Sequence, residues 1–133
     1  MNQIIFFRDK NGINEVEEYI EELIKRKDKD SRIKSNKIIG YLREVSQKGT
    51  QIGEKYIKHI DKEIWELRPL KDRILFAYID NNKFIILSKF VKKTKKTPKI
   101  EIVKAKNLLK KYKEGKEWIR KNMRNIVVLH GKS

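Results

Sequence analysis

The chain has 133 residues, of which 38% are hydrophobic and 39% charged, so it can build one modest core in one domain. Lys and Arg outnumber Asp and Glu by 34 to 18, and the formal net charge of +16 indicates an anionic partner: nucleic acid first, then an anionic membrane surface or an acidic protein. With no cysteine in the sequence, disulfides, thiolate chemistry and Cys-ligated zinc are excluded.

The first strand and helix are predicted from residues 3–24. Residues 3–8, QIIFFR, are typical of a short strand. Asn14 and Glu17 then have the spacing of a capping box, with Asn in place of the usual Ser or Thr. One apolar stripe at helical spacing follows, made of Val16, Tyr19, Ile20, Leu23 and Ile24. The first residues lack the basic region and long apolar stretch of a secretory signal, so we expect a cytoplasmic protein.

A second helix is predicted over residues 31–48, after a charged break at 25–30. Its inward stripe consists of Ile38, Tyr41, Leu42 and Val45. Gly49 is a natural stop for this helix, so the two helices form a hairpin. Residues 50–60 have no clear period, and we expect a loop that re-enters the sheet.

Three strands are predicted next, at about 63–68, 73–79 and 84–91. Asp80-Asn81-Asn82-Lys83 forms a good hairpin turn between the last two, because Asn tolerates positive φ. Alternation places Trp65 on an apolar face, where it packs in the core. No run approaches the roughly 18 apolar residues of a membrane-spanning helix.

A last helix is predicted to start at Thr97-Pro98, with Thr97 as the N-cap and Pro98 at the first helical position. Its buried stripe is Ile102, Ala105, Leu109 and Tyr112. Residues 116–133 are a possible C-terminal extension of the single domain 1–133, ending in a strand or a frayed tail at 126–129. The order β-α-α-β-β-β-α indicates an α+β fold, an antiparallel β-meander plus N-terminal strand, covered by an N-terminal helical hairpin and a C-terminal helix.

Positive charge is concentrated where the meander strands begin and end. Arg68 ends one strand, and Arg73 begins the next across a tight turn that contains Lys71. Further lysines stand at the end of the third strand: Lys89, Lys92, Lys93, Lys95 and Lys96. The amides at the start of the following helix add to this anion-binding character. Antiparallel pairing can bring these groups together.

Such a cluster suits the recognition, and the cleavage, of a phosphodiester. When a 2′-hydroxyl attacks its own phosphate, charge builds on the non-bridging oxygens, which Arg can hold with two parallel hydrogen bonds. A lysine crowded by other cations is a better proton-transfer group than an isolated one. The alternatives are solvated lysines, and sheet-edge ion pairs of the two arginines with Glu66 or Asp72. A non-catalytic nucleic-acid-binding module also remains open.

The other polar residues predict no metal site and no cofactor. His59 and His130 are the only histidines and lie far apart in the sequence. His59 is either a surface residue or lies near the predicted phosphate-binding cluster at the strand ends. Trp118 either contacts a partner or marks the end of the last helix.

From Glu66 the sequence reads ELR, with Arg73 five residues after Arg68, and later KFVKKTKKTP and IEIVKAK. This pattern resembles the HigB branch of the RelE/ParE toxin superfamily, with similarity from Ile4 to Tyr112. The resemblance implies a RelE-like fold and a type II toxin that cleaves mRNA in the ribosomal A site. It also implies a HigA-like helix-turn-helix antitoxin, and contact with operator DNA only through that antitoxin. We expect no membrane partner, because the apolar stripes of the helices are needed to cover the sheet. Some superfamily members inhibit gyrase instead.

By position, Arg68 resembles the basic residue that closes the first meander strand of RelE toxins. Arg73 resembles the phosphate-binding arginine that opens the next strand. Lys92 or Lys93 resembles the basic residue after the last long strand, and the predicted catalytic set is Arg68, Arg73, Lys92 and Lys93. Lys71, Lys89, Lys95 and Lys96 are predicted to bind RNA. RelE has a tyrosine in the segment that here reads TKKTPKIEI, so Thr94, Thr97 or a lysine would take its place. The resemblance keeps Glu101 as a structural brace for the lysines.

Overall fold

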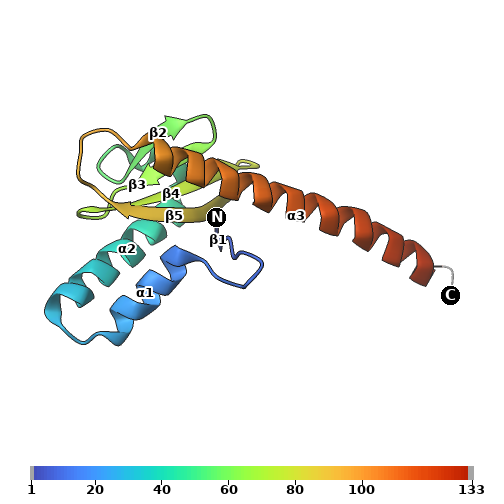
Figure 1. Cartoon of the computed structure of the whole chain (residues 1–133), viewed down its shortest axis with the longest axis horizontal. Coiled ribbons are helices and arrows are strands. Elements are labelled where there is room, and N and C mark those ends of the chain that lie inside the picture. The colour runs from blue at the N-terminus through green and yellow to red at the C-terminus, as the bar shows by residue number, and fades with distance from the viewer. Residues whose placement is uncertain (1, 132–133) are drawn as a thin grey trace.

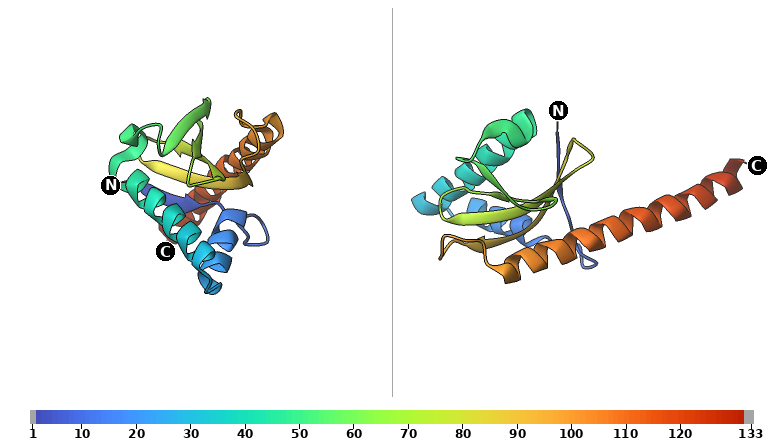
Figure 2. Two further views of the ribbon diagram at one scale, coloured as in Figure 1. Left: turned by 90° about the vertical axis from the view of Figure 1, so that its left-hand side faces the viewer. Right: turned by 90° about the horizontal axis from the view of Figure 1, so that it is seen from above.

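The structure, a computed structural model, describes the backbone of residues 2–131 and the side chains of residues 2–122. A five-stranded sheet lies between a pair of helices and a long third helix (Figures 1 and 2). The strands are β1 (Gln3–Phe6), β2 (Ile57–Asp61), β3 (Ile64–Leu67), β4 (Asp72–Ile79) and β5 (Lys83–Val91). The helices are α1 (Glu15–Lys25), α2 (Lys29–Lys48) and α3 (Lys99–Gly131), with a 3-10 turn η1 (Gly49–Ile52) after α2.

The sheet order is β1-β5-β4-β3-β2, with β1 parallel to β5 and every other pair antiparallel. The predicted α+β class, meander, N-terminal strand and helical hairpin are confirmed. The prediction of a loop through residue 60 is wrong, because residues 57–61 form the edge strand β2. Only Ile57 of this strand is buried, so its sequence lacks the apolar alternation that reveals a strand.

Each face of the sheet carries its own apolar cluster. Ile74 and Phe76 of β4 face α1 and α2, whereas Leu75 and Ala77 face α3. Because helices cover both faces of the sheet, β4 and β5 are buried on both sides, and their sequences are therefore continuous apolar runs. Trp65 packs on the α1–α2 side, as predicted.

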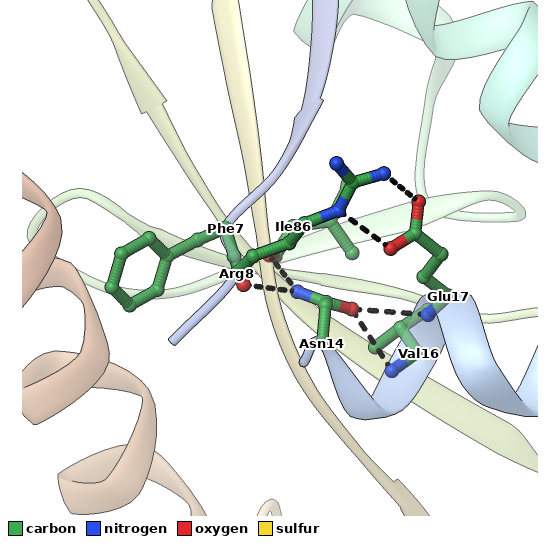
Figure 3. A network of polar contacts seen from close by, with 6 residues as sticks. All are labelled: Phe7, Arg8, Asn14, Val16, Glu17 and Ile86. Carbon is green, nitrogen blue, oxygen red and sulfur yellow. Dashed lines mark hydrogen bonds and ion pairs between the residues drawn. The ribbon is translucent and has the colours of Figure 1, made fainter. Parts of the chain in front are cut away.

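Asn14 joins the start of α1 to the sheet (Figure 3). Its Oδ1 accepts hydrogen bonds from the amides of Val16 and Glu17, and its Nδ2 donates to the carbonyls of Phe7 and Ile86. The predicted cap is confirmed, but Glu17 does not complete a capping box. Its carboxylate instead accepts two hydrogen bonds from Arg8, at 2.8 and 2.9 Å. Asn14 therefore caps a helix and covers the edge of β5 beyond its pairing with β1.

Replacing Asn14 by alanine is expected to lower the free energy of unfolding by about 2–4 kcal/mol, because a helix cap is lost and the carbonyls of Phe7 and Ile86 each lose one hydrogen bond. Urea denaturation at neutral pH measures the change. Asn36→Ala on the exposed side of α2 is the matched control and should change stability by about 0.5 kcal/mol or less. Equal stability of the two variants would contradict this role of Asn14.

The third helix begins later than its predicted cap. The carbonyl of Pro98 accepts the first helical hydrogen bond from Ile102, so Pro98 precedes the helix and does not occupy its first position. The Thr97 hydroxyl does not cap the helix, because it accepts no hydrogen bond from the first helical amides within the described residues; its own proton is donated to Glu66. The helix continues past Gly115 to Gly131, so residues 126–129 are helical, neither strand nor frayed tail.

Beyond Tyr112, which is its last buried residue among those with described side chains, α3 extends past the sheet (Figure 1). Trp118 on this segment is 66% exposed and lies outside the core. The side chains of Met123 and of all later residues lie outside the part of the chain whose side chains the structure describes. No helix in the described part of the chain is both long and apolar enough to cross a membrane.

Candidate nucleic-acid interface

Strand register brings the two arginines to the same end and the same face of the sheet. Arg68 directly follows β3, and Arg73 pairs with Phe90 of β5. Leu75 pairs with Glu66 and packs on the α3 side, and alternation places both arginines on that side too. The segment 92–98, which connects β5 to α3, begins at this same end.

Arg73 is held firmly by the turn that precedes it. Its Nη1 donates to the carbonyls of Leu70 and Asp72, both at 2.8 Å. Leu70 has φ 57°, a left-handed conformation that is unfavourable for leucine, so these hydrogen bonds help to stabilise a strained turn. Burial lowers the pKa of Arg73 below its ordinary value, but a guanidinium remains charged at neutral pH.

Glu66 lies between the two arginines. Its Oε1 is 3.7 Å from Nε of Arg73 and 3.9 Å from Nε of Arg68, and only 4% of the residue is exposed. The sequence offered this ion pair as the alternative to a phosphate site. In the structure the pair is present, and Arg73 also lines a hollow that is open to solvent.

The segment 92–97 is fixed at both ends. The Lys92 amide donates to the carbonyl of Lys71 at 2.8 Å, and the Thr97 hydroxyl donates to Oε2 of Glu66 at 2.6 Å. Between them, the Thr94 hydroxyl donates to the carbonyl of Lys96. Both threonines that could replace the RelE-type tyrosine therefore already donate their protons within the protein.

An open hollow of about 560 Å³ lies between the β3–β4 turn and this segment, and we call it the cationic groove. It is lined by Leu70, Lys71, Arg73, Lys92, Lys93, Thr94 and Lys95. Five of these seven residues are cationic and none is acidic. Such a lining attracts an anion, and its exposed lysines can follow a flexible phosphate chain.

Arg73 also lines a second, smaller space, which we call the crevice. Glu66, Arg68, Lys96 and Thr97 line it together with Phe90, Lys92, Thr94 and Lys95. Its volume of about 10 Å³ is room for roughly one water molecule, so it is too small for a phosphate group. Arg73 thus lines both a wide cationic groove and a narrow crevice that holds a carboxylate.

Two residues discussed with this site lie elsewhere. Lys89 points to the opposite face, where its Nζ is 4.3 Å from the ring centre of Tyr19 in α1. His59 lies on β2, where its ring is tilted against Trp65 and hydrogen-bonded to the carbonyl of Lys62. No group of three metal-ligating side chains occurs within the described residues.

Glu66 and Phe90 are the site residues that sequence reasoning did not single out for a role. Glu66 was considered only as an ion-pair partner, although a lone carboxylate inside an otherwise apolar strand is a usable signal. Glu101, which was expected to brace the lysines, has a buried Oε2 that no described group bonds. The brace is Glu66, since its carboxylate binds the lysine-rich segment through Thr97.

Tyr19 gives a pH-dependent test of how α1 attaches near this site. Burial, and then the 2.9 Å hydrogen bond to Asp72, raise its pKa to about 12. The unfolded chain releases this proton near pH 10 and the folded chain does not, so the stabilisation is complete below pH 10 and is lost between pH 10 and 12.

Between pH 9 and 11 the wild-type protein should therefore lose about 1 kcal/mol through Tyr19, after allowance for solvent screening of a half-buried group. Tyr19→Phe has no proton to lose, so its stability deficit relative to wild type should narrow by that amount. Urea denaturation of both proteins at the two pH values measures it. A constant deficit would contradict the raised pKa.

The fold and the site define a small, basic α+β protein with a cationic groove at one end of its meander. The family model for phage-derived Gp49-like proteins (DUF891) matches residues 22–110, which is more than half of the chain. The chain belongs to this family of RelE/HigB-type toxins. No match was found among curated proteins.

Among solved structures, the chain is similar to one from the YoeB-YefM complex of Staphylococcus aureus. The two chains are 15% identical, and the alignment has a TM-score of 0.47. It covers 70% of this chain and 99% of the other.

Proposed function

We propose that this toxin is a ribosome-dependent mRNA interferase of a type II toxin–antitoxin system, and that its cationic groove binds the scissile phosphate. The observation that carries the proposal is the composition of the groove, where five cationic and no acidic side chains line an open space. The net charge of +16 adds long-range attraction to ribosomal RNA.

The proposed reaction is transesterification. The 2′-oxygen loses its proton and bonds to phosphorus, the bond from phosphorus to the 5′-oxygen breaks, and that oxygen takes up a proton. The products are a 2′,3′-cyclic phosphate and a free 5′-hydroxyl. Arg73 and the lysines of the groove stabilise the charge on the non-bridging oxygens, for about 3 kcal/mol per well-placed donor.

Within residues 2–122, no group accepts a hydrogen bond from Nη2 of Arg73, so this nitrogen is free to donate to a phosphate oxygen. Lys92 and Lys93 are the candidates for proton transfer, because the hydroxyls of Thr94 and Thr97 are engaged elsewhere. Arg68 contributes charge from behind the groove, where its Nη1 donates to the carbonyl of Glu54.

The proposed partners are the ribosome with its mRNA and a HigA-like helix-turn-helix antitoxin, with operator DNA reached only through that antitoxin. Membership of a toxin family supports the antitoxin. Growth arrest on expression, relieved by co-expression of a neighbouring helix-turn-helix gene, is the expected result.

The decisive experiment adds the folded protein to a translating extract and maps the 5′ ends of the mRNA. We expect ends in register with codons, and none when ribosomes are omitted. Salt-sensitive RNA binding without scission would instead indicate a non-catalytic binding module. Intact mRNA together with inhibited supercoiling by purified gyrase would indicate the ParE-type activity.

A further inference from the structure

We propose that Glu66 is a positioning residue of this site, which holds Arg73 and the 92–97 segment in the arrangement that cleavage needs without touching the RNA. The inference rests on the proposed function. Its basis is that one buried carboxylate contacts both arginines with one oxygen and the lysine-rich segment with the other.

The two oxygens of Glu66 have different tasks. Oε2 accepts a short hydrogen bond from Thr97, which fixes the end of the segment that carries the groove lysines. Oε1 lies 3.7 and 3.9 Å from the two guanidinium Nε atoms, which are distances of charge contact. The carboxylate therefore connects β3, β4 and the segment before α3 at a single point.

The two hollows that Arg73 lines differ in the room that they offer to a ligand. The crevice, which Glu66 also lines, has room for about one water molecule, whereas the cationic groove is open and has no acidic residue in its lining. The groove therefore offers a phosphate the space that the crevice lacks. Glu66 contacts the guanidinium without lining the groove, much as an orienting carboxylate holds a metal ligand or a catalytic histidine.

Removing the charge of Glu66 should separate binding from catalysis. In Glu66→Gln the net charge near the groove becomes more positive, so RNA binding does not weaken. The carboxamide keeps one acceptor oxygen and has lost its charge, so it can no longer hold Thr97 and both guanidinium groups at once. The geometry required in the transition state is then lost and kcat falls at least tenfold. A residue that only stabilised the fold would leave kcat of the folded protein unchanged.

The test compares Glu66→Gln, Thr97→Val and the control Glu63→Gln. The control removes the same charge from a half-exposed carboxylate that pairs with Lys113, away from the groove. Cleavage of ribosome-bound mRNA gives kcat and KM, and hydrogen exchange of a peptide covering 92–98 reports the attachment of the segment. Circular dichroism and urea denaturation confirm that each variant is folded.

For Glu66→Gln we expect a kcat at least tenfold below wild type, an unraised KM and faster exchange in 92–98. Thr97→Val should show the faster exchange and a smaller fall in kcat, and Glu63→Gln should behave as wild type. Wild-type kcat, a raised KM or unchanged exchange in folded Glu66→Gln would overturn the proposal. If the wild-type protein cleaves nothing, the proposed function fails, and the exchange of 92–98 alone decides whether Glu66 anchors the segment.

Discussion

Replacing Arg73 by alanine is expected to reduce mRNA cleavage by 100-fold or more. The side chain lines the cationic groove and has one guanidinium nitrogen free for a phosphate oxygen, and removal of one such donor typically costs a factor of about 10²–10³. The rate of appearance of codon-registered 5′ ends in a translating extract measures the effect.

This substitution also affects stability, because Arg73 holds the turn at Leu70 and faces a buried Glu66. We expect a loss of about 2–4 kcal/mol in the free energy of unfolding, so activity must be compared in protein shown to be folded. Arg73→Lys keeps the charge but cannot reproduce the guanidinium geometry, and should also cleave slowly. Arg43→Ala on exposed α2 is the control. Wild-type cleavage by folded Arg73→Ala would remove Arg73 from the mechanism.

Replacing Lys92, Lys93 and Lys95 together by glutamine is expected to weaken RNA binding by about 10- to 100-fold at low salt, with the fold intact. All three side chains are exposed and line the groove. Each lost phosphate contact lowers the slope of log K against log salt by roughly 0.7 for a single strand, so the slope should fall by about 2. Fluorescence anisotropy with a labelled RNA over a salt series measures both.

The control for this triple variant replaces Lys27, Lys29 and Lys34, which are exposed on the helical hairpin. This control also removes three positive charges, so it lowers the net charge of +16 by as much as the groove variant does. If binding depends on the groove, the control should lose much less affinity than the groove variant. Equal losses would show that the total charge binds RNA and that the groove has no special part in it.

Much of the fold was predictable because the chain carries local signals that agree with one another. The stripe of Val16, Ile20 and Leu23 identified α1, and Gly49, with φ 68°, ended α2 as predicted. The turn after Ile79 was also predicted, and Asp80 and Asn81 have the positive φ it requires. Strand β2 was missed because an edge strand with exposed polar residues has no periodic apolar signal.

The site was only partly predictable because contacts across the sheet depend on register. The sequence placed Arg68, Arg73 and the lysines at strand ends, but a bulge between β4 and β5 shifts the register, and Lys89 lies on the α1 face. Thr97 was assigned to the helix that follows it, because nothing local shows a carboxylate 31 positions earlier. The roles of these residues in cleavage remain predictions.

The central claim is that an RNA phosphate binds in the groove against Arg73. The most direct measurement is a titration of the arginine Nε–H signals by NMR with an RNA oligonucleotide that has a 2′-deoxy nucleotide at the scissile position. We predict that the signal of Arg73 shifts saturably, with a smaller shift for Arg68, while those of Arg26 and Arg43 stay in place. Saturable binding that shifts Arg26 or Arg43 and leaves Arg73 unchanged would contradict the claim.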